Sequence, residues 1–253
     1  MPRYGKQKPR IDIFQDGFID LAERGLELIR HYGIELLPWQ ELVLRRWLAT
    51  DKNDCWANNN CGLVVPRQNG KSELLIARII IGMIFRGEHI VFTAQSVETA
   101  NTIKRRVFRF YFEAESEIRD LLTSEFDKEP RSFDYVEIRN GGRCAFRTRT
   151  RSGGLGTTND VIIIDEAQEY TDAQQEALRP TISAGHLGNS QTIMAGTPPT
   201  AGTAGTVFER TRRNILAGKG GSWCWQEWSV ENITTNDDKD AWYATNPSLG
   251  YFV

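Results

Sequence analysis

The hydrophobic positions along this chain switch between a helical and a strand-like spacing, which predicts strands alternating with helices. Apolar residues recur at helical spacing over residues 15–33 and again over residues 38–48, where Pro38 is typical of a first helical turn. A short apolar run at residues 63–65 predicts a buried strand. A third helical pattern begins at Leu74 and continues through Ile81.

The rest of the chain repeats this alternation. Residues 160–165 include four consecutive β-branched residues, a run typical of a strand that is covered on both faces of a parallel sheet. We also expect strands at 88–95 and 191–195, a hairpin at 132–151 that turns at 140–142, a long helix at 97–122, a helix at 171–184 broken by Pro180, a helix at 203–216 and a Trp-rich edge strand at 222–230. This order favours an α/β fold with a mainly parallel central sheet flanked by helices, with ligands at its carboxyl edge.

Length and composition bound the domain organisation. The 253 residues, 40% hydrophobic and 25% charged, are ordinary for a globular protein with one large α/β domain. No apolar run reaches membrane-spanning length, so no membrane partner is expected. The basic N-terminus lacks the apolar core of a secretory signal and is expected to be a flexible arm. We expect a helical segment at 1–50, a core at 51–230 and a C-terminal segment at 231–253 without closing structure.

Charge and cysteine usage narrow the function classes. The net charge of −2 gives no global signature for nucleic acid, so any contact with a polyanion must come from a local patch. Four arginines share one parity of the predicted return strand, and they fit either a solvated face or a phosphate-facing ladder; they are Arg143, Arg147, Arg149 and Arg151. The four cysteines are scattered and only three histidines accompany them, which argues against a zinc site and favours an intracellular chain with free thiols.

The first motif that carries chemistry lies between the 63–65 strand and the following helix, in Pro66-Arg-Gln-Asn-Gly-Lys-Ser-Glu73. A strand, a turn and Gly-Lys-Ser at a helix start indicate a phosphate-binding loop, because helix-start amides and the helix dipole face the phosphates. Lys71 is expected to reach the β- and γ-phosphates, and Ser72 to bind Mg²⁺. The first glycine of the common pattern is replaced by Val65. Taken alone, Gly-Lys-Ser also fits an ordinary helix start.

The second motif is the acidic pair at the end of the 160–165 strand. Asp165 at a strand tip beside a phosphate loop is placed to hold Mg²⁺, and Glu166 to polarise a water molecule against the γ-phosphate. The alternative is that the pair only caps the next helix.

Two further elements fit a nucleotide site. Trp39 and Gln40 open the 38–48 helix and suit an adenine clamp, since a glutamine amide offers a donor and an acceptor to a base edge and an aromatic ring can wall a pocket. A half-buried helix start is the alternative. Thr197 lies in Gly196-Thr-Pro-Pro199 after the 191–195 strand, a turn that fits either simple punctuation or a sensor of nucleotide state.

Together, and in this order, these motifs resemble the large terminase subunit of tailed bacteriophages. The specific part is the loop, since this family drops the first glycine and carries Arg-x-x-Gly-Lys-[Ser/Thr], as Arg67 to Ser72 do. The segment Asn246-Pro-Ser-Leu-Gly250 also resembles the point where such proteins leave the ATPase domain. The resemblance covers nearly the whole chain and implies a RecA-like P-loop NTPase fold of the ASCE type.

The resemblance also implies site roles for particular residues. Arg67 senses or stabilises the γ-phosphate, Lys71 and Ser72 act with ATP and Mg²⁺, Asp165 holds Mg²⁺ and Glu166 activates water. The nucleotide-binding set is Trp39, Gln40, Arg67, Gln68, Asn69, Gly70, Lys71, Ser72 and Thr197. The family's arginine that is donated between subunits lies before the acidic strand, where Arg151 or Arg149 is the nearest substitute.

The implied function is ATP hydrolysis that drives double-stranded viral DNA into a procapsid. The implied partners are DNA, the portal protein, the small terminase subunit and further copies in a ring, in the host cytoplasm and transiently at the portal. The family's nuclease domain is not expected in this chain, so no DNA cleavage is expected.

Two rival functions remain open. A helicase-like DNA translocase shares a glutamine element, Gly-Lys-Ser and Asp165-Glu-Ala-Gln168, but needs a second RecA-like domain. A nucleotide-binding scaffold without hydrolysis fits the missing first glycine, although Lys71, Asp165 and Glu166 argue against it.

Overall fold

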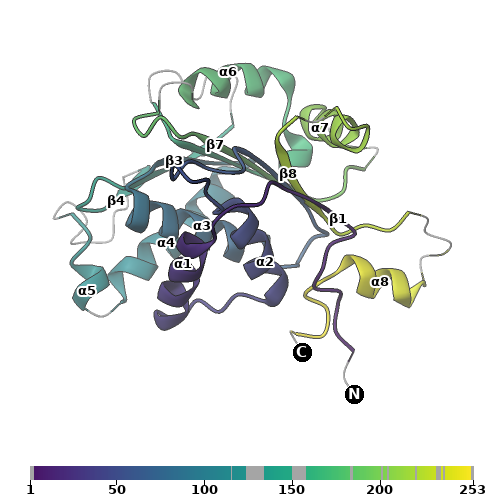
Figure 1. Ribbon diagram of the computed structural model, residues 1–253, viewed down its shortest axis with the longest axis horizontal. Helices are drawn as coiled ribbons and strands as arrows, with labels where there is room; N and C mark the ends of the chain where they lie inside the picture. Colours follow the sequence, from purple (N-terminus) through teal and green to yellow (C-terminus); the bar gives the residue numbers. More distant parts are fainter. Residues whose placement is uncertain are drawn as a thin grey trace.

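One mixed sheet forms the centre of the molecule (Figure 1). The computed structural model describes residues 3–114, 116–123, 134–149, 158–182, 185–200, 202–203, 205–219, 221–231, 235 and 237–251. In these residues the sheet has the strand order β1-β8-β2-β7-β6-β3-β5-β4. The strands are β1 (Ile11–Ile13), β2 (Asn60–Val64), β3 (His89–Ala94), β4 (Tyr135–Glu137), β5 (Arg143–Thr148), β6 (Val161–Asp165), β7 (Gln191–Gly196) and β8 (Trp223–Glu227).

The direction of the strands explains where a ligand site can form. Strands β8, β2, β7, β6, β3 and β5 pair in parallel, whereas β1 and β4 pair antiparallel at the two edges. The register places Val64 beside Gly196 and Asp165 beside Ala195. The phosphate loop, the acidic pair and the Gly-Thr-Pro turn therefore leave the sheet at the same carboxyl edge, as the sequence predicts.

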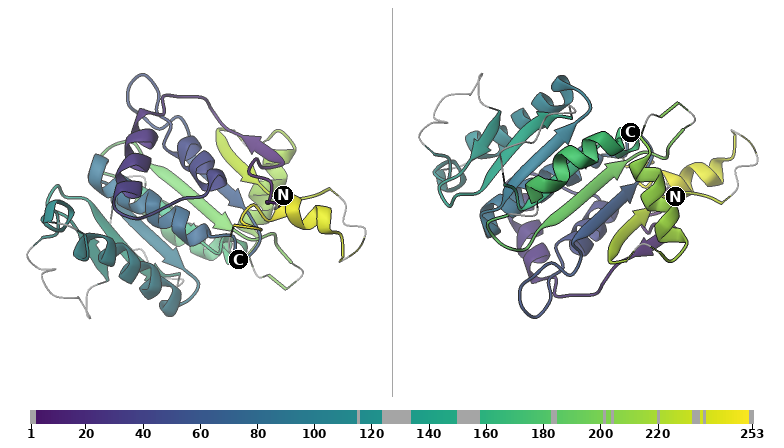
Figure 2. Two further views of the ribbon diagram at one scale, coloured as in Figure 1. Left: turned by 90° about the horizontal axis from the view of Figure 1, so that it is seen from below. Right: turned by 90° about the horizontal axis from the view of Figure 1, so that it is seen from above.

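Helices cover both faces of the sheet. In Figure 1, α1 to α4 lie on one side of it and α6 and α7 on the other; Figure 2 shows both faces. None of the helices in the described part of the chain is both long and apolar enough to cross a membrane. The helices are α1 (Asp20–His31), α2 (Pro38–Trp47), α3 (Lys71–Arg86), α4 (Val97–Phe112), α5 (Ser116–Arg119), the 3-10 helix η2 (Ala167–Glu169), α6 (Asp172–Ile182), α7 (Val207–Leu216) and α8 (Lys239–Thr245).

The larger core lies under α1 to α4 and contains a buried polar network. Arg78 of α3 forms two hydrogen bonds to Glu88, at 2.6 and 3.1 Å, and both side chains are fully buried. The Oε1 atom of Gln191 accepts from Arg78, while its Nε2 donates to the carbonyls of Trp47 and Asn58. Because the two charges are paired with each other, their burial does not leave an isolated ion. The network also joins α3 to the starts of β3 and β7.

Four predictions differ from the structure. The 222–230 strand was expected at an edge, but β8 lies between β2 and β1, because residues 11–13 pair with it. The N-terminus is therefore not a free arm over residues 3–13. The predicted 97–122 helix is divided into α4 and α5, and Pro180 lies inside α6 without ending it.

The C-terminal segment also differs from the expectation. Instead of running on without closing structure, it forms α8 and then packs residues 246–251 against the N-terminal residues. The main-chain N–H of Gly5 donates to Leu249 O at 2.9 Å, and that of Lys6 donates to Tyr243 O at 2.8 Å. Both ends of the chain and α8 lie together in Figure 1.

Candidate active site

The phosphate loop connects β2 to α3 and explains the missing glycine. Val65 is fully buried, and its N–H donates to Gly196 O at 3.2 Å, so this position belongs to the sheet core. The turn is made further along, where Gln68 (φ 62°) and Gly70 (φ 83°) adopt left-handed conformations. Such conformations favour glycine, and for Gln68 the cost is about 1 kcal/mol or more. The loop therefore folds tightly although its first glycine is absent.

Lys71 is the first residue of α3 and lies at the positive end of its dipole. Burial lowers the pKa of Lys71, the charge of Arg67 adds to this, and the charges of Glu166 and Asp165 oppose it. Arg67 is exposed and Ser72 half-buried. The described residues thus bring a buried ammonium and an exposed guanidinium to the carboxyl edge, an arrangement suited to a polyphosphate.

Asp165 ends β6 and is only 4% exposed. Burial, followed by the charge of Glu166, raises the pKa of Asp165 to about 6. Its Oδ1 accepts from Glu166 N–H at 3.0 Å, and no ion pair joins it to any described cation. A buried carboxylate without a paired cation is a strong candidate ligand for a divalent metal ion.

Glu166 is held in a special geometry. Its φ of 49° is left-handed, and it does not cap the following η2 helix through its side chain. The carboxamide of Gln168 donates through Nε2 to Glu166 Oε2 and accepts through Oε1 from Thr197 N–H at 3.0 Å. Gln168 therefore connects the acidic strand to the Gly-Thr-Pro turn. Gln168 stands in the same short motif as the acids, but no local pattern predicts its link to Thr197.

Arg149 lies in a different place from the exposed ladder suggested by its parity. It is 7% exposed, and its Nη1 donates to the carbonyls of Thr93 at 3.0 Å and Asp165 at 2.6 Å. Nη2 donates to Glu166 O at 3.3 Å, and burial lowers the pKa of Arg149. The guanidinium of Arg149 is bound to main-chain carbonyls of its own subunit, so it is not available to a neighbouring subunit. The prediction that Arg149 substitutes for the arginine donated between subunits is therefore wrong. Arg151 lies outside the described residues.

Gln40 and Trp39 are both brought to the loop, but in different ways. Gln40 is 2% exposed; its Nε2 donates to Gly70 O at 2.8 Å and its Oε1 accepts from Leu37 N–H at 2.6 Å. Trp39 is fully buried, edge-on to Trp228 at 5.2 Å between ring centroids. In this structure Trp39 offers no surface to an adenine ring, and Gln40 braces the phosphate loop through its main chain.

A cavity of about 630 Å³ borders the loop at Pro66. It continues between the Gly-Thr-Pro turn and the end of β8, with Pro198, Trp228 and Thr245 in its lining. Its size is within the range of small-molecule sites, and it lies beside the residues predicted to hold phosphates.

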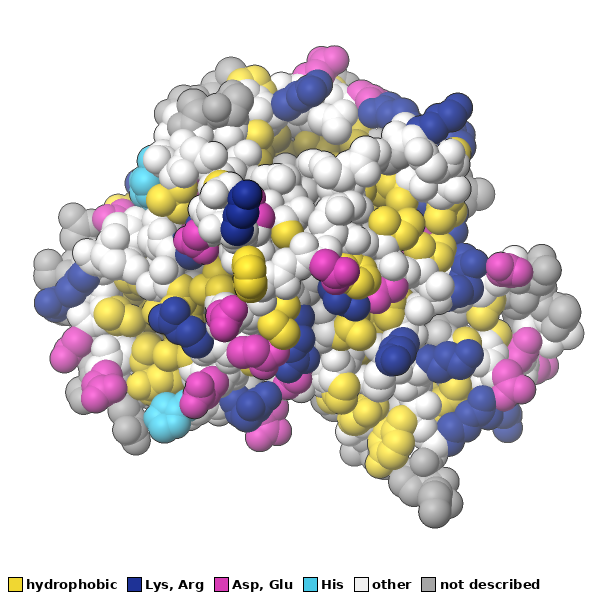
Figure 3. Space-filling view, viewed as in Figure 1, with side chains coloured by type: hydrophobic (Ala, Val, Ile, Leu, Met, Phe, Trp, Pro, Cys, Tyr) yellow, Lys and Arg dark blue, Asp and Glu magenta, His cyan; other side chains and the backbone are white. Residues whose placement is uncertain are grey.

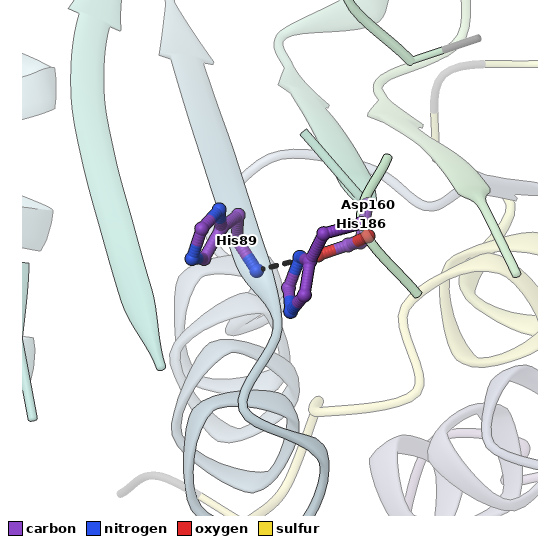
Figure 4. A group of neighbouring side chains, drawn as sticks. All are labelled: His89, Asp160 and His186. Atoms are coloured by element: carbon purple, nitrogen blue, oxygen red, sulfur yellow. Dashed lines mark hydrogen bonds and ion pairs between the residues drawn. The ribbon is translucent and has the colours of Figure 1, made fainter. Parts of the chain in front are cut away.

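A second group of titratable side chains lies at the opposite edge of the sheet (Figure 4). Asp160 Oδ2 accepts from His89 N–H at 2.8 Å and lies 2.7 Å from His186 Nδ1, and its Oδ1 accepts from Leu187 N–H at 2.9 Å. The three residues meet the spacing of a metal group, but the carboxylate is already engaged by these donors. Arg143 and Arg147 line a small cavity with His89, so positive charge surrounds the site. This arrangement fits a structural link between β3, β6 and the 185–190 loop.

On the face drawn in Figure 3, charge alone does not mark a nucleic-acid site, because basic and acidic side chains of the described residues are interspersed there. Arg143 lies 3.9 Å from Glu137 and stacks over Tyr135. Both interpretations of the arginine parity therefore stay open for Arg143 and Arg147.

Comparison with known proteins finds similarity in three dimensions. No family model matches the sequence, and no curated protein matches it. The large terminase of bacteriophage HK97 superposes with a TM-score of 0.74 and 16% identity, over 92% of this chain and 49% of that one. The large terminase of a second, thermophilic bacteriophage gives 0.51 and 12% identity, over 78% of this chain and 47% of that one.

The chain thus spans about half the length of the solved terminases that it resembles. The mainly parallel sheet flanked by helices confirms the α/β fold that the sequence predicts. Over the matched residues, the chain has the fold of the HK97 large terminase.

Proposed function

We propose that this chain hydrolyses ATP to drive double-stranded DNA into a viral procapsid, as the ATPase of a large terminase. The observation that carries the proposal is the meeting of Lys71 with Asp165 and Glu166 at one sheet edge. Lys71 starts α3, Asp165 ends β6 and Glu166 directly follows it, and their charges act on one another. A cation, a metal-ligand carboxylate and a candidate general base are the groups that phosphoryl transfer to water requires.

Each side chain has a task in this proposal. Lys71 and Arg67 hold and neutralise the β- and γ-phosphates, with the α3 amides beneath them. Glu166, oriented by Gln168, orients and polarises the attacking water. Arg149 fixes the main chain from which both acids project. The cavity beside Pro66 has room for the nucleoside.

The site also fits Mg²⁺. Asp165 supplies a buried carboxylate and Ser72 a hydroxyl, and oxygen ligands of this kind suit that ion. When bound with ATP, Mg²⁺ neutralises charge on the phosphates. A divalent cation also explains why an acid with a pKa of about 6 is kept buried and without a paired cation.

The partners belong to the same proposal. We expect the chain to act in a ring on the portal, with double-stranded DNA and the small terminase subunit, in the host cytoplasm and transiently at the procapsid. An arginine from a neighbouring copy completes the site, and Arg151 is the candidate.

Nucleotide binding by Lys71→Ala tests the proposal. We expect wild type to bind ATP with Mg²⁺, and Lys71→Ala to lose at least about tenfold in affinity, the effect of a charged phosphate contact. Lys52→Ala, in an exposed loop, is the matched control and is expected to bind as wild type does. Equal binding by all three proteins contradicts the assignment of the loop. Unwinding of a DNA duplex favours the helicase alternative.

A further inference from the structure

Asn69 of the phosphate loop makes hydrogen bonds both within its own loop and to the C-terminal segment. It is 2% exposed, and its Nδ2 lies 3.2 Å from both Pro66 O and Arg67 O, so it folds the loop back on itself. The same atom donates to the side-chain oxygen of Asn246 at 2.9 Å. Asn69 stands between the two left-handed residues, where the loop conformation most needs support.

Ser248 provides that support from the far end of the chain. Its N–H donates to Asn69 Oδ1 at 3.1 Å, and its hydroxyl donates to Asn69 O at 2.7 Å. The same hydroxyl accepts from the indole of Trp39 at 3.0 Å. Ser248 is 5% exposed, so water does not readily replace these bonds. One hydroxyl therefore joins the phosphate loop, α2 and the C-terminal segment.

The C-terminal segment is itself anchored. Gln7 Nε2 donates to Pro247 O at 2.6 Å, and Gln7 Oε1 accepts from Trp39 N–H at 3.1 Å. Asn246 is tied back to α8 through Trp242 O. The segment thus has a fixed position, and it transfers that position to the loop through Asn69.

We propose that Ser248 and Asn246 are positioning residues of the ATP site, which hold the phosphate loop in its nucleotide-binding conformation through Asn69. This inference rests on the proposed function. It makes residues 246–248 part of the nucleotide-binding machinery although they are about 180 residues away along the chain. It also means that nucleotide bound in the loop changes the protection of the C-terminal segment.

The test uses the full chain with Ser248→Ala and Asn246→Ala, and Ser222→Ala in an exposed position as the matched control. We expect both site variants to keep a cooperative thermal transition. We also expect the KM for ATP to rise about tenfold while kcat changes less than about twofold. The reason is that a loop-positioning bond is made equally in the ground and transition states. The control is expected to match wild type.

Hydrogen exchange separates this role from general stabilisation. In wild type we expect ATP analogue and Mg²⁺ to protect the amides of residues 67–70 and of Asn246, Ser248 and Leu249. In Ser248→Ala we expect the C-terminal amides to be protected less. Without nucleotide, loop amides 67–70 are expected to exchange faster in Ser248→Ala than in wild type, while amides in β3 do not.

Unchanged loop exchange and unchanged KM in the folded variants overturn the inference. If wild type binds no nucleotide, the proposed function fails, but the exchange of the loop without nucleotide still decides whether Ser248 positions it. Should Ser248→Ala fail to fold, Asn246→Ala decides the outcome, because it removes one acceptor of Asn69 and leaves both hydrogen bonds from Ser248 to Asn69 in place.

Discussion

The buried carboxylate of Asp165 lowers the stability of the nucleotide-free protein at neutral pH. Its pKa is raised from the ordinary 3.8 to about 6, so between these values the native state binds more protons than the unfolded state. The cost of the buried charge is therefore absent below about pH 4 and fully present above about pH 6. At neutral pH the nucleotide-free protein carries an ionised group that burial disfavours.

Removing the ionisable carboxyl of Asp165 is therefore expected to stabilise the nucleotide-free protein at neutral pH. Near pH 7, Asp165→Asn is expected to raise the free energy of unfolding of the nucleotide-free protein by about 1 to 3 kcal/mol, and to abolish ATP hydrolysis. The gain should shrink as the pH falls towards 4. Thermal unfolding across this pH range measures it, and a loss of stability at neutral pH contradicts the account.

Arg149 supports a second prediction at this scale. Arg149→Met leaves the carbonyls of Thr93 and Asp165 without their donor, so we expect a loss of about 2 to 4 kcal/mol in unfolding free energy and a fall in kcat. Lysine cannot make the forked contact, and Arg149→Lys is not expected to restore activity. The control is Arg147→Met, at a half-buried position of β5. A wild-type kcat in Arg149→Met would contradict the proposal that Arg149 holds the main chain of the acidic pair in its own subunit.

At the scale of elements, β2 and β8 pack so closely that one position requires glycine. A Cβ at Gly62 meets the ring of Trp225 in β8 at 2.1 Å, and this fully buried ring packs against Phe208 of α7. Gly62→Ala is expected to cost about 1 to 3 kcal/mol or more, since overpacking displaces a rigid ring. Gly202→Ala, which meets nothing within 4 Å, is the control. Equal chemical denaturation curves for the two variants would contradict this prediction, because they would show that the core accommodates the added methyl group.

The local sequence predicts which elements form better than it predicts where each element lies in the sheet. The β-branched run of β6, the turn at 140–142 and the helix start at Lys71 are local signals, and the structure confirms them. The place of β8 depends on pairing with β1 more than 200 residues earlier, which no local pattern encodes. Pro180 is another case, because tertiary packing keeps α6 continuous where the residue's own tendency is to end a helix.

The same distinction applies to the candidate site. Lys71, Asp165 and Glu166 could be predicted because each stands in a short motif at a strand or helix end. Trp39 could not be placed correctly, since its burial depends on Trp228 and Ser248, which come from the far end of the chain. The burial of Arg149 could not be predicted, because the parity that groups it with Arg143 and Arg147 does not apply beyond Thr148, where β5 ends.

At the scale of the whole molecule, the carboxyl edge gathers parts from the entire chain. The phosphate loop, the acidic strand, the Gly-Thr-Pro turn and residues 246–248 meet there, and residues 5–7 hold the last of these in place. Segments that look peripheral in sequence therefore help to shape the candidate site.

The most direct test of the account is phosphate release from ATP by wild type and by Glu166→Gln, with Mg²⁺ and at high protein concentration so that neighbouring copies can meet. Glu166→Gln keeps the size of the side chain and removes the charge that polarises water. Glu176→Gln, on an exposed position of α6, is the control. We expect wild type and control to release phosphate at equal rates and Glu166→Gln to be slower by about 100-fold or more, with ATP binding retained. Equal release by wild type and Glu166→Gln would contradict the assignment of this edge as the site of hydrolysis.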